Sequence, residues 1–192
     1  AYIMSYLKVH HPNYFYANIL SNTIGSEKKT AQIIDEAKQQ NINILSPNIN
    51  YSHWFYKATT KGIYLSIGAI KGVGYQSVKL IVDERQANGE FKDFFDFARR
   101  IPKRVKTRKL LEALILVGAF DDLGKNRATL LQSIDQVLDD VSDVEQDGFI
   151  FDVLTPKATY TESEELEDNQ LSEYEKEYLG FYVTTHPVEK AF

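Results

Sequence analysis

The stretch that decides the fold reads Leu65-Ser66-Ile67-Gly68-Ala69-Ile70-Lys71-Gly72-Val73-Gly74 and continues into Tyr75-Gln76-Ser77-Val78. Two short apolar segments are joined by a tight turn in which two glycines bracket a valine, and a new helix is predicted to begin directly after it. A helix N-terminus presents bare backbone N–H groups, which suit a phosphate. The pattern predicts a helical hairpin that holds a phosphate, and a plain turn between two helices that binds nothing is an equally open interpretation.

The contacts of this hairpin would come from one cation, from backbone amides that the glycines leave accessible, and from the first polar side chains of the following helix. The candidate DNA-binding residues here are Lys71, Gly72, Val73, Gly74, Tyr75, Gln76 and Ser77. Such contacts position a duplex without reading its sequence. The turn is not a nucleotide-binding P-loop, because the Gly-x-x-x-x-Gly-Lys-Ser/Thr spacing is absent.

A dense basic run follows the first hairpin and precedes a second hairpin candidate, which has a single glycine, at residues 110–121. Its members are also candidate DNA-binding residues: Arg99, Arg100, Lys103, Arg104, Lys106, Arg108 and Lys109. A run of this density can follow a phosphate backbone. The alternative is a solvated turn, and the closeness of the two hairpins favours the DNA interpretation.

Hydrophobic periodicity predicts a mainly α fold with one small β-hairpin, the latter from the segments 54–58 and 63–65. The predicted helices are 1–8, 12–21, 26–40, 75–87, one capped by Asp93, one capped by Thr107, one starting near Asn126, and one capped by Ser172 and ending near Leu179. We expect four regions: 1–50, 51–138, 139–171 and 172–192. The third is predicted to be an acidic linker.

The net charge of −5 conceals an asymmetry. Residues 1–138 carry nineteen Lys and Arg against twelve Asp and Glu, whereas residues 139–192 carry three against fifteen. A basic front suits a phosphate-backbone binder. The chain has no cysteine, which excludes disulfides and thiolate zinc sites. With no long apolar run and no signal-peptide pattern, we expect a soluble, cytoplasmic protein without a membrane partner.

Catalytic chemistry finds little support in the sequence. Two-metal nucleotidyl transfer uses paired carboxylates, but the pairs here fall at helix ends or in the acidic tail: Asp121-Asp122 and Asp139-Asp140. The histidines show no HExxH spacing and have no cysteine partners: His10, His11, His53 and His186. We therefore predict no catalytic residue and no metal ligand in this chain.

A glutamine followed by an aromatic anchor lies inside the acidic linker. Its residues are Gln146, Phe149, Ile150 and Phe151. A short aromatic segment in a flexible linker is typical of a peptide that docks in the apolar pocket of a partner. The alternative is that its phenylalanines pack onto their own domain.

Taken in order, these motifs resemble the bacterial DNA polymerase III alpha subunits, the C-family replicative polymerases. The segment Ala1–Pro12 is similar to the helix that ends the fingers core of that family. The hairpin at 68–74 comes next, and Gly89-Glu90-Phe91, Val117–Asp121, Glu175–Tyr182 and His186-Pro187 follow. The similarity covers essentially the whole chain, and its spacing is that of the shorter form of the enzyme.

The resemblance implies an internal, non-catalytic segment: the end of the fingers over 1–50, a tandem helix-hairpin-helix region over 51–138, and a last helix leading toward an OB-fold. It implies double-stranded DNA as a ligand, with the sliding clamp and other replisome proteins as partners of the parent polymerase. The catalytic aspartates and their Mg²⁺ belong to the palm of that parent, so no cofactor is expected here. The family's clamp-binding peptide lies where Gln146–Phe151 stands, although Gly148 departs from its spacing. The open alternatives are a stand-alone helix-hairpin-helix module of a repair protein and a structural helical connector.

Overall fold

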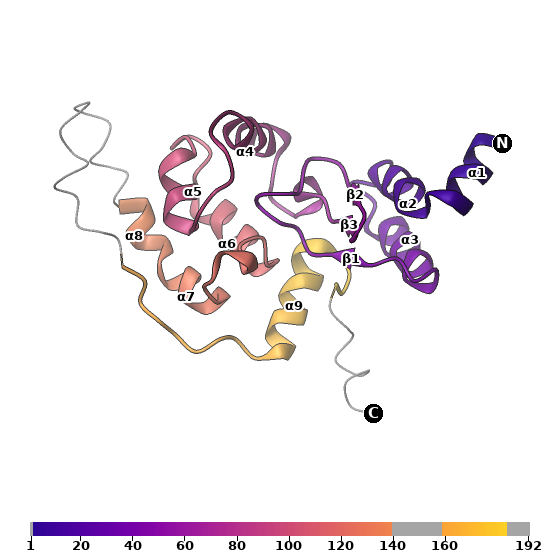
Figure 1. The fold of residues 1–192 in the computed structure, drawn as a ribbon. Coiled ribbons are helices and arrows are strands. Elements are labelled where there is room, and N and C mark those ends of the chain that lie inside the picture. The colour runs from indigo at the N-terminus through magenta and orange to yellow at the C-terminus, as the bar shows by residue number, and fades with distance from the viewer. Residues whose placement is uncertain (1, 140–158, 184–192) are drawn as a thin grey trace.

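The structure is a computed structural model that describes residues 2–139 and 159–183. Within these residues the fold is mainly helical with one small sheet (Figure 1). The helices are α1 (Tyr2–His10), α2 (Pro12–Ser21), α3 (Glu27–Gln39), α4 (Tyr75–Asn88), α5 (Phe94–Arg100), α6 (Arg108–Leu116), α7 (Arg127–Gln132), α8 (Ile134–Asp139) and α9 (Asp168–Leu179). Two 3₁₀ turns, η1 (Ile67–Ala69) and η2 (Asp121–Leu123), precede α4 and α7. The predicted fold class is confirmed.

The sheet has three short strands, β1 (Ile44–Leu45), β2 (Lys57–Thr59) and β3 (Gly62–Tyr64), in the order β1-β3-β2. The predicted hairpin is β2 paired antiparallel with β3, with Ala58 opposite Ile63. The segment Asn43–Leu45 is extended, as its sequence indicates, and its last two residues form β1, which pairs parallel with β3 through Ile44 and Ile63. This pairing was not predicted. This close approach depends on Gly62, because a Cβ there would lie 2.3 Å from the carbonyl oxygen of Asn43.

The core lies between the sheet and the helices α4 to α8, with α2 and α3 on the N-terminal side (Figure 1). Four buried phenylalanine rings contact one another within it: Phe91, Phe94, Phe97 and Phe120. Their ring centroids are 5.1 to 5.2 Å apart in edge-to-face contacts. This cluster fixes α5 against the turn that follows α6, and so sets the relative position of the two hairpins.

Three element boundaries differ from the prediction. The last helix begins at Asp168 and is capped by Glu167 in a capping box with Gln170, whereas Ser172 lies inside it and donates a hydrogen bond to the carbonyl of Asp168. The predicted helix from Asn126 is divided at Ser133, whose hydroxyl bonds back to the carbonyl four residues earlier, a contact that bends helices. The first half of the Gly72 hairpin is only the 3₁₀ turn η1.

None of the helices in the described part of the chain has the length and the apolar character needed to cross a membrane.

Candidate nucleic-acid interface

Two apolar residues hold the hairpin at Gly72 in place. Ile70 and Val73 are buried on either side of the turn, and the amide of Val73 donates to the carbonyl of Ile70 at 3.1 Å. Gly72 has φ +85°, a left-handed conformation that favours glycine. Before the turn, Ser66 caps η1 by accepting a hydrogen bond from the amide of Ala69. The apolar pattern of the sequence therefore folds locally into a rigid, closed turn.

The N-terminus of α4 emerges directly from this turn with Gly74 as its N-cap. Within residues 2–139 and 159–183, the structure offers no hydrogen-bond acceptor to the amides of Gly74, Tyr75 and Gln76. No acidic side chain lies in the first turn of this helix, so the positive end of the helix dipole is uncompensated there. The N–H of Val73 bonds inside the turn, so among the candidate residues it is Gly74, Tyr75 and Gln76 whose amides are available to a ligand.

Lys71 is engaged on two sides. Its ammonium pairs with the carboxylate of Glu27, at the start of α3, with an N–O distance of 2.9 Å. Its amide donates to the carbonyl of Tyr178 in α9 at 2.8 Å. The charge that the sequence analysis assigned to the phosphate is therefore shared with a carboxylate, and its backbone ties the hairpin to the last helix.

A second cation at the turn is Lys109, which comes from the first turn of α6. A Cβ placed on Gly72 would lie 2.8 Å from the Cε of Lys109 and 3.6 Å from its Nζ. The alkyl chain of Lys109 therefore lies over the glycine and brings its ammonium to the hairpin. From the sequence, Lys109 is only one member of the basic run, because no local pattern connects two residues as far apart in the chain as Gly72 and Lys109.

Three members of the basic run form hydrogen bonds or ion pairs with other residues of the chain. Arg100 bonds Glu84 at 2.9 Å and Asp96 at 3.2 Å, and it stacks on the ring of Phe91. Lys106 is buried and donates to the carbonyl of Ala98. Burial lowers the pKa of Lys106 to about 8. These two members of the predicted DNA-binding run therefore bond acceptors within the chain.

Arg108 is the third: it pairs with Glu112 and Asp135 on the surface. The remaining members, Arg99, Lys103 and Arg104, are exposed and form no ion pair within the described residues. Together with Lys109, they are the cations of the run that are accessible to a polyanion.

The hairpin at Gly118 also has a left-handed glycine, but side chains of the chain itself occupy the space beside it. Gly118 has φ +83°, and a Cβ there would lie 2.4 Å from the Nη2 of Arg127 and 2.5 Å from the Oδ2 of Asp121. The guanidinium of Arg127 bonds Asp121 at 2.8 Å and the carbonyl of Leu116 at 2.8 Å, and it approaches Glu175 of α9 at 3.5 Å. Its side chain is 8% exposed and that of Glu175 is 1% exposed. A buried ion pair, not a ligand, closes this turn.

The other polar candidates have structural partners. Asp121 pairs with Arg127, and Asp122 accepts a hydrogen bond from the side-chain amide of Asn48 at 2.7 Å. Burial lowers the pKa of His53 to about 4, and the positive charges of Arg85 and Lys57 act in the same direction. The described residues contain no group of three or more histidine, aspartate or glutamate side chains that could hold a metal ion. Six further residues named in the sequence analysis lie outside the described residues: Asp140, Gln146, Phe149, Ile150, Phe151 and His186.

Comparisons with known proteins show what the chain is similar to in sequence. A family model described as a helix-hairpin-helix motif matches residues 41–130. The DNA polymerase III subunit alpha of Staphylococcus aureus (strain COL) is 77% identical over 192 residues, which is the whole of this chain and 18% of that protein. The protein of the same name from Staphylococcus epidermidis is 76% identical over the same residues, again with 18% of its length covered. The chain thus corresponds over its whole length to an internal stretch of the DNA polymerase III alpha subunit, and it carries a helix-hairpin-helix motif.

Proposed function

We propose that this chain is a duplex-gripping segment of a replicative DNA-directed DNA polymerase, that it contacts phosphates without reading sequence, and that it carries out no chemistry itself. The observation that carries the proposal is the N-terminus of α4, where three amides and an uncompensated helix dipole directly follow the glycine turn over which Lys109 lies. Amide donors and a lysine fix a phosphate in place but make no contact with base edges. The proposal is further supported by the helix-hairpin-helix model that covers both turns.

The proposed DNA contacts differ from the full set of sequence candidates. They comprise the amides of Gly74, Tyr75 and Gln76, the side chains of Gln76 and Ser77, and the ammonium of Lys109. Lys71 contributes where a phosphate displaces Glu27, and Arg99, Lys103 and Arg104 add exposed positive charge. Arg100 and Lys106 are assigned to the fold because their donors are already used.

Binding of a blunt duplex across a salt series tests this function. Each phosphate that is neutralised releases counterions, so log Kd should change with log salt concentration by about 0.9 per contact. Lys109→Ala should reduce this slope by about one without changing sequence preference. The matched control is Lys61→Ala, an exposed lysine in the turn at the other end of β3 from the hairpin. A flat salt response would favour the structural-connector alternative and would reject the proposal.

We also propose that the sliding clamp attaches near this segment through Gln146, Phe149, Ile150 and Phe151. The support is positional: residues after this stretch are anchored on α7, where Glu165 accepts hydrogen bonds from the amides at its start. Replacing Gln146, Phe149 and Phe151 by alanine in the full-length alpha subunit should weaken clamp binding while leaving duplex binding intact. Unchanged clamp affinity would mean that these side chains do not contact the clamp.

A further inference from the structure

A line of aromatic rings leads away from the Gly72 hairpin. Tyr75, the first residue of α4, lies with its ring centroid 5.2 Å from that of Trp54. Trp54 packs over Gly68 in η1, where a Cβ would lie 2.5 Å from its ring. Phe55 follows Trp54 in the chain and borders a pocket whose other end is Tyr14. We call Tyr75, Trp54, Phe55 and Tyr14 the aromatic strip.

Three rings of the aromatic strip are unusually exposed for their size. Tyr75 is 51% exposed, Phe55 57% and Tyr14 60%. Exposed rings gathered in one place mark a binding surface more often than isolated ones do. The strip begins at Tyr75, the first residue of α4, so a DNA strand that follows it would start beside the proposed phosphate site.

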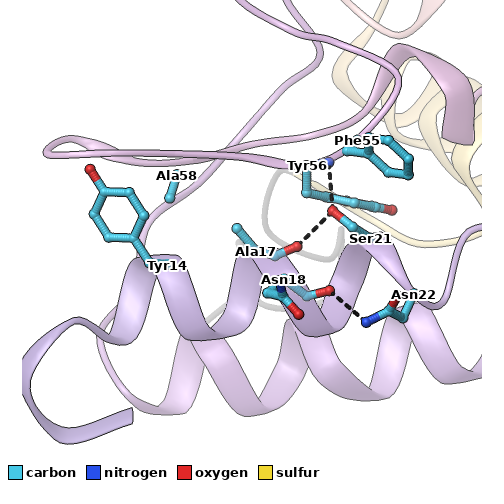
Figure 2. Close-up of a pocket in the computed structure, with 8 residues that line it drawn as sticks. All are labelled: Tyr14, Ala17, Asn18, Ser21, Asn22, Phe55, Tyr56 and Ala58. Carbon is cyan, nitrogen blue, oxygen red and sulfur yellow. Dashed lines mark hydrogen bonds between the residues drawn. The ribbon is translucent and has the colours of Figure 1, made fainter. Parts of the chain in front are cut away.

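The pocket at the far end of the aromatic strip has a volume of about 440 Å³ and lies between α2 and the segment that leads into β2. Figure 2 shows Tyr14 and Phe55 at its two ends, with Asn18 and Asn22 on the helix below. Asn22 donates to the backbone carbonyl of Asn18 at 3.2 Å, which leaves its own side-chain oxygen as an acceptor. No charged side chain lines this pocket.

We propose that this pocket takes an unpaired DNA base, and that a single strand continues along the aromatic strip from the duplex end held at the hairpin. The inference rests on the proposed function of the hairpin. Aromatic faces stack any base, and asparagine amides carry both the donor and the acceptor that base edges require. The lining contains no carboxylate to repel phosphates. Lys57, the exposed first residue of β2, follows the lining residue Tyr56 in the chain and adds a cation to this segment.

Binding of two DNA molecules to the 192-residue chain tests the inference: a blunt duplex, and the same duplex with a single-stranded overhang of thymidines. The overhang should tighten binding, and Phe55→Ala or Tyr14→Ala should remove at least about fivefold of that gain. Neither variant should change the affinity for the blunt duplex. Phe55→Tyr keeps a stacking face and should retain the gain, while Tyr2→Ala, which removes an exposed ring outside the strip, should have no effect.

The fluorescence of Trp54, the single tryptophan of the chain, gives an independent readout. The overhang should change its emission, and the change should be lost in Phe55→Ala. The inference is overturned if the overhang gives no gain in the wild-type chain, if the gain survives in both alanine variants, or if the full-length alpha subunit shows no such gain.

The two proposals fail in different ways. If the blunt duplex does not bind but an oligonucleotide of thymidines binds through Phe55 and Tyr14, the pocket stands and the function proposed for the hairpin falls. If the blunt duplex binds with the expected salt dependence and the overhang adds nothing, the hairpin stands and the pocket falls.

Discussion

The hairpins at Gly72 and Gly118 have nearly the same left-handed glycine, with φ +85° and +83°, and opposite surroundings. At Gly72 the space beside the turn holds only the end of a flexible lysine, and the next helix presents amides without acceptors. At Gly118 the space holds a buried guanidinium bonded to two carboxylates. A glycine turn before a helix therefore does not identify a ligand site by itself. Whether a ligand can bind there depends on the groups that pack against the turn.

The two hairpins also differ in the role that we assign to them. The Arg127 network joins α6, α7 and α9 at the Gly118 hairpin, and this rigid unit carries Lys109 to the other turn. In turn, α9 meets the Gly72 hairpin through the bond from Lys71 to Tyr178. One hairpin thus supports the fold, and we propose that the other binds DNA.

The largest expected effect is on stability at the closed hairpin. Arg127→Ala leaves the buried Glu175 without its guanidinium, and breaking such a pair costs about 3 to 5 kcal/mol. The free energy of unfolding, measured in urea, should fall by this amount, whereas Arg99→Ala should change it by less than about 0.5 kcal/mol. Equal free energies of unfolding for the two variants would show that the ion pair at the Gly118 hairpin does not stabilise the fold.

The next effect concerns the buried member of the basic run. Lys106 has a pKa of about 8 in the folded chain and an ordinary value of 10.5. Between these values the unfolded chain holds one more proton, so stability should rise with pH from about 8 upward. Tyrosines also titrate in this window, so the informative quantity is the difference between wild type and Lys106→Met. That difference should grow in favour of the wild type as the pH rises, and a constant difference would place Lys106 in solvent.

A smaller effect, on DNA affinity, tests the open hairpin. Gln76→Glu places a carboxylate beside the free amides, where it helps the helix dipole but repels a phosphate. Duplex binding should weaken about tenfold at low salt without loss of stability. Gln86→Glu makes the same charge change in the last turn of α4 and serves as the control. If both variants bind alike, only net charge matters and the amides hold no phosphate.

The smallest expected effect separates the two lysines at the open turn. Because Lys71 already pairs with Glu27 at 2.9 Å, Lys71→Ala should lower the salt slope less than Lys109→Ala does. Glu27→Gln should release Lys71 and strengthen duplex binding by a few fold. Weaker binding of Glu27→Gln would show that this ion pair organises the hairpin instead of competing with its ligand.

Much of the fold was predictable because its signals are local. Asp93 and Thr107 cap α5 and α6 as predicted, each accepting a hydrogen bond from an amide three residues later. The parallel pairing of β1 with β3 was not predictable in this way, because two residues of strand leave no period to detect. Ser172 is a residue type that commonly caps helices, but the N-cap of α9 is Glu167, which lies in the acidic segment before it.

The local features of the candidate site were predictable from the sequence, but its long-range contacts were not. The glycines and apolar residues of the first hairpin indicated its turn, but the sequence could not show that Lys109 would lie over Gly72 or that Glu27 would meet Lys71. Both contacts join residues distant in the chain. The same holds for Arg127, whose burial beneath Gly118 follows only from the packing of α6 against α7 and α9.

Amide chemical shifts measured by NMR while duplex DNA is added test the central comparison most directly. The proposal predicts that the amides of Gly74, Tyr75 and Gln76 shift during the titration, while those of Gly118 and Ala119, which bond backbone carbonyls within the closed turn, stay in place. Shifts at Gly118 and Ala119 with none at the start of α4 would contradict the account.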